Sequence, residues 1–206
     1  MSVVRATLEP LTFHFEDDGL VPNNPMPFLV YKGAIVVGGA EPERTIELLF
    51  AQNGWGDMWR NGVYDFPHYH ATVHEVLGVA RGHARVRFGG DHGSEFDIAA
   101  GDVAILPAGT GHQRISASAD FSVVGAYPPG PTMQVTRPTP ENHAKALKTI
   151  PQVGLPKTDP VMGADGPLVR LWTRDYLSLS CQDTPKRSDV QPNLPTNGYR
   201  STSGRS

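Results

Sequence analysis

Between residues 63 and 127, apolar and polar residues alternate in short segments, which is the pattern of half-buried β-strands. Turns containing Gly, Asp or Ser separate these segments. In chain order they read HYH, HEVLGVA, HARVRF, SEFDIA, VAILP, HQRIS and FSVVGAY. Many short strands joined by tight turns predict an antiparallel sandwich or barrel.

The segments before this region carry other patterns. LVYKGAIVV (29–37) predicts a β-segment. The turn-rich run EDDGLVPNNPMP before it excludes a regular helix, because its PNNP stretch places two prolines and two asparagines close together. ERTIELLFAQNGW (43–55) places its apolar residues on one helical stripe and predicts a short helix.

After the barrel region we expect one further helix and one extended segment. Thr139 is suited to be an N-cap and Pro140 to be the first helical residue, so PENHAKALKTI predicts a helix. DPVMGADGPLVRLWTRDY predicts an extended segment that packs Leu168, Leu171 and Trp172 back onto the domain.

A chain of 206 residues suits one domain with extensions. We expect N-terminal strands and a lid region packing on the barrel over 1–61, and the barrel core over 62–127. A C-terminal wrap with a short helix would span 128–182. The stretch 183–206 is poor in large apolar residues and predicts a flexible tail.

Composition excludes several classes of function. The chain has 18 Lys+Arg and 21 Asp+Glu, a formal net charge of −3, and no basic stripe that would indicate nucleic acid. Its single cysteine, Cys181, excludes an intrachain disulfide, and no apolar run is long enough to span a membrane. We therefore expect a cytoplasmic protein that acts on a small molecule.

Four side chains of metal-ligand type recur at fixed offsets among glycines and one proline. The ligand-type residues are His68, His70, Glu75 and His112. Residues two apart on a strand point to the same face, so His68 and His70 present their imidazoles side by side. Glu75 follows a short turn, and His112 arrives from another hairpin after the PAGTGH turn. A site of nitrogen and oxygen donors without thiolate suits Fe(II), Mn, Ni, Cu or Zn.

The other histidines are expected to lie outside this ligand set. His74 adjoins Glu75, but strand alternation turns it away. The rest have no such partners in the sequence and are expected to be solvated: His14, His83, His92 and His143.

Residues near the ligands are candidates for a substrate pocket. Arg114 and Ser116 should share the face of His112, and Leu77 the face of Glu75. Arg114 would bind a carboxylate or enolate oxygen, or would instead form a structural salt bridge with Asp102 or Glu95.

Aromatic residues precede the first histidines. Trp55, Trp59 and Tyr64 would wall the entrance against an aromatic or polyketide-like substrate, or would belong to the core.

The spacing also resembles the two motifs of the cupin superfamily. Residues 62–82 match G-x5-HxH-x4-E-x6-G, and residues 101–112 match G-x5-PxG-x2-H, while Ser116 replaces the final Asn of the second motif. Wider segments over 13–172, such as WRNGVYDFPHYH and GDVAILPAGTGH, are similar to small single-domain cupins labelled YjlB-like. The resemblance implies an all-β double-stranded β-helix (jelly roll) with short peripheral helices, and by analogy a homodimer. It implies no substrate.

Two classes of function remain open. As an enzyme, the protein would hold one divalent transition metal per chain, with iron favoured and zinc, manganese or nickel as alternatives. Glu75 would move protons and Arg114 would orient an enol, catechol or polyketide-like substrate. The reaction would be a dioxygenation, or an oxygen-independent isomerase or lyase reaction. The other class is a non-catalytic small-ligand-binding cupin.

Overall fold

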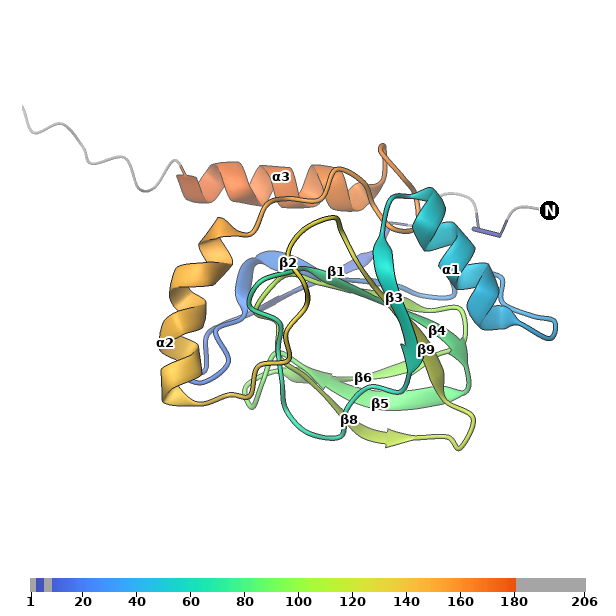
Figure 1. The fold of residues 1–206 in the computed structure, drawn as a ribbon, viewed down its shortest axis with the longest axis horizontal. Helices are drawn as coiled ribbons and strands as arrows, with labels where there is room; N and C mark the ends of the chain where they lie inside the picture. Colours follow the sequence, from blue (N-terminus) through green and yellow to red (C-terminus); the bar gives the residue numbers. More distant parts are fainter. Residues whose placement is uncertain (1–2, 6–8, 181–206) are drawn as a thin grey trace, which may run out of the picture.

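Two antiparallel sheets form the barrel that the alternating segments predict (Figure 1). The structure is a computed structural model that describes residues 3–5 and 9–180. The larger sheet has the strand order β1-β2-β7-β4-β9-β3, and the smaller sheet has the order β6-β5-β8. The strands are β1 (Leu11–Phe15), β2 (Asn24–Tyr31), β3 (Gly56–Asn61), β4 (Glu75–Arg81), β5 (His83–Phe88), β6 (Ser94–Ala99), β7 (Val103–Leu106), β8 (His112–Ala117) and β9 (Ser122–Tyr127). This is a jelly-roll barrel, which confirms the fold class.

The central strands of the larger sheet are buried on both faces, and the strand alternation decides which side chain enters the barrel. On β4, Leu77 belongs to the cluster inside the barrel, together with Phe88 on the opposite sheet. Its neighbour Val76 belongs to a second cluster on the outer face, together with Ile46 and Trp172 from the covering helices. The inner face therefore carries Glu75 and Leu77 into the same space.

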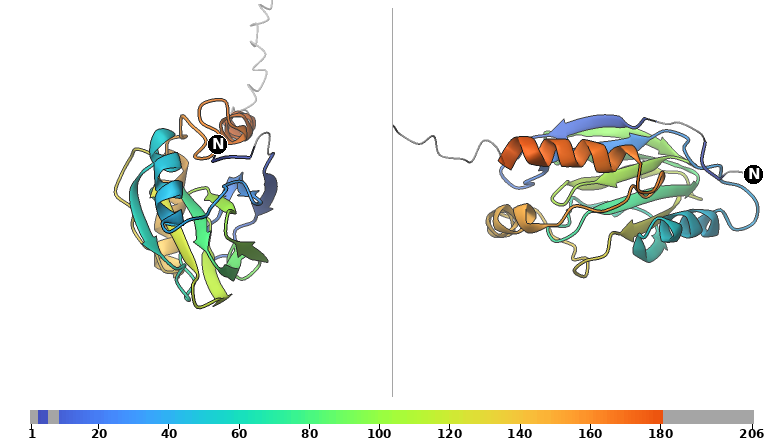
Figure 2. Two further views of the ribbon diagram at one scale, coloured as in Figure 1. Left: turned by 90° about the vertical axis from the view of Figure 1, so that its right-hand side faces the viewer. Right: turned by 90° about the horizontal axis from the view of Figure 1, so that it is seen from above.

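The helices over residues 42–52 and 167–180 cover the outer face of the larger sheet (Figure 2). The two helices predicted from the sequence are present as α1 (Pro42–Gln52) and α2 (Pro140–Thr149), followed by a 3₁₀ turn over Ile150–Gln152. Thr139 caps α2, because its side-chain oxygen accepts a hydrogen bond from the Asn142 N–H. Both helix predictions are confirmed.

A third helix replaces the extended segment predicted near the C-terminus. It is α3 (Pro167–Ser180), and it contacts β2. Leu168, Leu171 and Trp172 do pack onto the sheet, as expected. Their spacing of three and then one residue is the helical i, i+3, i+4 pattern, and the prediction overlooked it beside the Gly- and Pro-rich run before it. The buried Asp159 carboxylate accepts a hydrogen bond from the Leu168 N–H and so caps the first turn.

The N-terminal part contributes more to the barrel than an attached layer would. From residues 1–61, strands β1, β2 and β3 are members of the six-stranded sheet. Strand β2 begins at Asn24, so part of the turn-rich run is extended. Pro25 and Pro27 are accommodated because pairing of β2 with β7 starts only at Leu29. The predicted tail over 183–206 lies outside the described residues.

None of the helices in the described ranges combines the length and apolar character needed to cross a lipid bilayer.

Candidate metal centre

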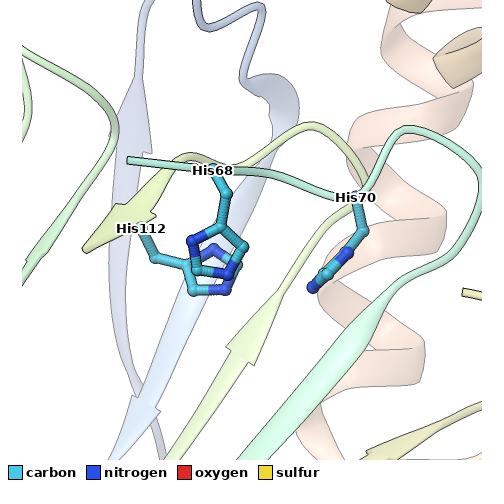
Figure 3. Close-up of side chains that lie close together, drawn as sticks. All are labelled: His68, His70 and His112. Atoms are coloured by element: carbon cyan, nitrogen blue, oxygen red, sulfur yellow. The ribbon is translucent and has the colours of Figure 1, made fainter. Parts of the chain in front are cut away.

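Three histidine side chains meet inside the barrel, and one ring nitrogen of each lies within 4.8 Å of the others (Figure 3). His68 and His70 lie on the extended segment before β4, and His112 is the first residue of β8. His68 and His112 face each other in an isolated antiparallel bridge, in which each backbone N–H donates to the carbonyl of the other residue. All three side chains are buried.

The residue between the first two histidines faces the opposite way. Tyr69 forms its own bridge with Thr136 and belongs to a small core cluster with Ala146 and Ile150. Because His68 and His70 flank it on one extended strand segment, their imidazoles share the barrel face. The side-by-side presentation predicted from the HxH spacing is what the structure shows.

The Nδ1 atom of each of the three rings is hydrogen-bonded to a backbone carbonyl oxygen. His68 Nδ1 lies 3.1 Å from the Phe66 carbonyl oxygen. His70 Nδ1 lies 2.8 Å from the Gln134 carbonyl oxygen, and His112 Nδ1 lies 3.1 Å from the Thr110 carbonyl oxygen. A carbonyl only accepts, so each Nδ1 carries a proton, and in the neutral form of each ring Nε2 is the nitrogen left to bind a metal. This is how metal-binding imidazoles are oriented in proteins.

Glu75 brings a carboxylate to the same point. Its Oε1 lies 3.4 Å from His70 Nε2, and its Oε2 lies 3.3 Å from His112 Nε2. Two atoms that each lie about 2.1 Å from one ion, at tetrahedral or octahedral angles, are about 3.0 to 3.4 Å apart. Oε2 is buried and has no hydrogen-bond partner among the described residues. The donor set therefore fits a divalent cation.

The charges of the site are arranged for a cation as well. Burial lowers the pKa of His68 to about 3 and keeps that ring neutral. Burial alone would raise the pKa of Glu75, but the electrostatic effect of the adjacent His70 and His112 imidazoles holds it below its usual value. Burial lowers the pKa of His70, and the Glu75 carboxylate outweighs that effect and raises it. An ionised carboxylate among buried imidazoles attracts a metal ion.

A cavity of about 270 Å³ opens onto these side chains. Besides the three histidines and Glu75, its lining residues are Trp59, Arg60, Asn61, Gly62, Val63, Tyr64, Leu77, Tyr127 and Met133. Trp59, Tyr64 and Leu77 were proposed for the pocket from the sequence, and the structure places them there. Trp55 instead belongs to the core and donates a hydrogen bond to the Thr158 carbonyl.

Two sequence-predicted pocket residues do not line this cavity. A register shift between Arg85 and Val86 leaves Ile115 unpaired on β8. Ser116 consequently lies opposite the outward-facing Arg85 and is exposed, so its predicted place in the pocket is wrong. Arg114 precedes the bulge and keeps the face of His112.

The guanidinium group of Arg114 does not line the cavity. Its Nη2 lies 3.9 Å from Asp65 Oδ2. The alternative partners named from the sequence have other ion pairs, Asp102 with Lys32 and Glu95 with Arg87.

His74 lies outside the ligand set, as the alternation predicted. It is fully buried, and its Nδ1 accepts a hydrogen bond from the Ala108 N–H. Burial lowers its pKa to about 4. Its ring packs 4.7 Å from that of Trp172 on α3, so His74 ties the turn before His112 to this helix.

The other histidines lie away from the metal centre. His14, His83 and His92 are exposed, as expected. His143 is not simply solvated, because its Nε2 lies 2.8 Å from both carboxylate oxygens of Asp17.

Sequence reasoning missed Tyr127, whose hydroxyl donates a hydrogen bond to Glu75 Oε1 (3.0 Å). The alternation of β9 contained the signal. Gly125 pairs with Leu77, so Tyr127, two residues later, faces the same interior. A tyrosine on the inner face of a strand opposite the metal-site strand was therefore a candidate.

A jelly-roll barrel with this histidine group belongs to the cupin class, and comparison with known proteins narrows the assignment. The chain is 37% identical over 167 residues to the uncharacterized protein YjlB of Bacillus subtilis (strain 168), a match that covers 81% of this chain and 98% of YjlB. The chain therefore belongs to the YjlB family of small cupins. No protein-family model matches it.

Several solved structures are similar to parts of the chain. Acireductone dioxygenase from Bacillus anthracis, with cadmium in its active centre, is 18% identical with a TM-score of 0.30, over 46% of this chain and 60% of that one. A DUF861 family protein from Thermotoga maritima is 22% identical with a TM-score of 0.27, over 44% of this chain and 92% of that one. RmlC from Streptococcus suis, in complex with dTDP-D-xylose, is 16% identical with a TM-score of 0.34, over 61% of this chain and 72% of that one. The chain spans less than two thirds of the dioxygenase, and at these identities and TM-scores the structures bear on neither substrate nor reaction.

Proposed function

We propose that this protein is a metal-dependent enzyme that acts on a small organic substrate of the enol, catechol or polyketide type. His68, His70, His112 and Glu75 would hold one divalent transition metal. The reaction we favour is dioxygenation. Iron is the metal we favour, because histidine and carboxylate donors with open positions are typical of non-haem Fe(II) oxygenases.

The observation that carries the proposal is the common orientation of the three imidazoles. Each Nδ1 is committed to a backbone carbonyl, so each Nε2 is left for another partner. These rings lie at the wall of a cavity and are buried. A purely structural histidine cluster has no need of three Nε2 atoms directed at one point next to a carboxylate.

The charge of the cavity narrows the substrate class. The cation among its lining residues is Arg60, whose guanidinium pairs with Glu47 through contacts of 2.5 and 2.9 Å. Arg114, expected to bind a substrate carboxylate, is absent from the lining. An anionic substrate would therefore find no free arginine or lysine on the described wall, which favours an uncharged or enolisable molecule.

The shape and chemistry of the wall support a planar substrate. Tyr64 lies edge-on to His68 at 5.1 Å between ring centroids and stacks on Phe66 at 4.7 Å. Trp59 and Leu77 supply further apolar surface. A volume of about 270 Å³ suits a molecule of one or two rings.

The chain's own residues would bind and orient such a substrate. Tyr64, Trp59 and Leu77 would exclude water from one side and hold the ring against the histidines. Glu75 would accept a proton as the substrate enolises. A metal ion at this site would polarise a substrate oxygen and, if redox-active, would allow reaction with dioxygen.

Elemental analysis of the protein purified without added metal tests the proposal, with His70→Ala as the test variant and the exposed His92→Ala as its matched control. We expect about one metal equivalent per chain in the wild type and in His92→Ala, and a loss in His70→Ala. Occupancy that stays near one in His70→Ala would contradict the ligand assignment.

The identity of the metal and the use of oxygen then separate the reaction classes. Iron, together with oxygen uptake in the presence of an enol or catechol, supports a dioxygenase. Zinc or manganese with turnover under anaerobic conditions indicates an isomerase or lyase. If the wild-type protein takes up no metal even after reconstitution, the enzyme proposal is wrong and the non-catalytic small-ligand-binding cupin is the remaining function. The homodimer implied by analogy stays a prediction, which light scattering of the full chain would check.

A further inference from the structure

A chain of hydrogen bonds runs from the cavity wall to the metal centre. Trp59 Nε1–H donates to the Tyr127 hydroxyl oxygen (2.7 Å), and the Tyr127 hydroxyl donates to Glu75 Oε1 (3.0 Å). The three residues come from β3, β9 and β4, which are adjacent in the larger sheet. All three line the cavity.

The chemistry of the three groups fixes the direction of both hydrogen bonds. An indole N–H only donates, and an ionised carboxylate only accepts. The phenol between them must therefore accept from Trp59 and donate to Glu75. Because its one proton is committed to Oε1, the Tyr127 hydroxyl holds the carboxylate in one orientation.

The backbone of β9 leaves room for the Trp59 indole, which donates the first of these two hydrogen bonds. Gly125 lies on β9 directly beneath the Trp59 indole, and a Cβ built on it would come within 2.1 Å of the Trp59 Cε2 atom. Any larger residue at position 125 would push the indole away from Tyr127. The close approach of ring and backbone therefore depends on this glycine.

The consequence concerns the two oxygens of Glu75. Oε1 accepts the hydrogen bond from Tyr127, whereas Oε2 is buried without a hydrogen-bond partner in the described part of the chain and lies 3.3 Å from His112 Nε2. We propose that Tyr127 and Trp59 are positioning residues of the metal centre, which tie Oε1 back and reserve Oε2 as the ligand oxygen. This inference rests on the proposed metal site.

The test variant is Tyr127→Phe in the full chain, which removes the hydroxyl and keeps the ring. Its matched control is Tyr31→Phe. The Tyr31 hydroxyl is also buried and also donates to a buried carboxylate, that of Asp159, but it belongs to the outer cluster of the sheet. Cobalt(II) is the probe, because its visible absorption reports the number and geometry of its ligands and its affinity can be measured by chelator competition.

We expect Tyr127→Phe to weaken cobalt binding about 10- to 100-fold, the usual effect of removing a partner that orients a metal ligand. We also expect an altered cobalt absorption spectrum, because Oε1 becomes free to join the coordination sphere. Tyr31→Phe should keep the wild-type affinity and spectrum. Trp59→Phe and Gly125→Ala should each give a smaller loss, below about tenfold, in the same direction.

The outcomes separate this inference from the proposed function. If the wild type binds no cobalt, the metal site itself is wrong. If the wild type binds cobalt and Tyr127→Phe matches it in affinity and spectrum, the positioning role is overturned. Equal losses in Tyr127→Phe and Tyr31→Phe also overturn it, because a general loss of stability would then explain both. If Tyr127→Phe does not fold, Trp59→Phe and Gly125→Ala decide: wild-type affinity and spectrum in both overturn the proposal.

Discussion

The imidazole rings of His68 and His112 lie with their centroids 3.9 Å apart across an antiparallel bridge in which the two residues exchange both backbone hydrogen bonds. The main chain therefore sets the separation of two candidate ligands, before any metal binds. Such a site loses little conformational entropy on binding. We expect it to bind metal tightly.

Metal should stabilise the folded protein through this pair. At a free metal concentration of 100 times Kd, binding adds about 2.7 kcal/mol to the free energy of unfolding. Thermal denaturation with saturating metal and with chelator should therefore give clearly different midpoints for the wild type. His112→Ala should give the same midpoint in both conditions. A metal-dependent midpoint that persists in His112→Ala would place the ion elsewhere.

The turn before His112 should tolerate no side chain at Gly109. This residue has a φ of +93°, and a Cβ would lie 2.5 Å from the Asn23 carbonyl oxygen. We expect Gly109→Ala to lower the free energy of unfolding by about 1 to 3 kcal/mol and to weaken metal binding, because His112 moves with the turn. Urea denaturation measures the first effect and chelator competition the second.

Gly38→Ala is the matched control for this substitution. A Cβ there meets nothing within 4 Å, and its φ is not positive. Stability should change by less than about 0.5 kcal/mol. Equal effects of the two substitutions would contradict the role assigned to the turn.

The ion pair between α1 and β4 should make stability depend on pH. Arg81 donates two hydrogen bonds to the nearly buried Glu43 carboxylate, of 2.8 and 3.1 Å, and they lower the pKa of Glu43 from 4.5 to about 2. Because the folded-state pKa lies below the unfolded value, this stabilisation is present above about pH 4.5 and is lost as the pH falls towards 2. Arg81 is partly exposed, so we expect an effect of about 1 kcal/mol.

Glu43→Gln tests this dependence. At pH 7 the variant should be about 1 kcal/mol less stable than the wild type in urea denaturation. The difference should shrink as the pH is lowered from 4.5 to 3. A difference that stays constant over this range would show that the carboxylate charge is not its cause.

Ser116 and Leu77 should respond differently to truncation. Ser116 is exposed beyond the β8 bulge, so Ser116→Ala should change stability by less than about 0.5 kcal/mol and leave metal binding unaltered. Leu77 is buried and lines the cavity. Leu77→Ala should lower the free energy of unfolding by about 2 to 5 kcal/mol. Urea denaturation of both variants distinguishes them, and a large cost at Ser116 would place that side chain inside the barrel.

Much of the barrel could be predicted because strands such as β5 alternate buried apolar with exposed polar residues, and because the turns between strands carry glycine. The register of single residues could not. The unpaired Ile115 reverses the faces of β8 from Ser116 onwards, and nothing in an alternating HQRIS segment marks such a bulge. Helix α3 was missed for a different reason. Its i, i+3, i+4 pattern is short and follows a run of turn residues.

The candidate ligands could be predicted from local spacing, because the HxH pair and Glu75 lie within a few residues of one another and His112 ends the PAGTGH turn. Their supporting contacts could not. The Tyr127–Glu75 hydrogen bond joins residues 52 positions apart, and it depends on how β4 and β9 pair. Likewise, whether Arg114 faces the cavity depends on the position of Asp65 in a separate loop. Such contacts arise only once the strands have assembled.

The carbonyl that orients His70 belongs to Gln134, which lies 64 residues further along the chain. At translation rates of 5 to 20 residues per second, those residues take between about 3 and 13 seconds to add. Once His112 has been added, 22 residues before Gln134, the nascent chain contains every candidate ligand, but nothing yet sets the tautomer of His70. We therefore expect the proposed metal to be loaded only by the finished fold, because histidines that emerge earlier have no geometry with which to select among cellular cations.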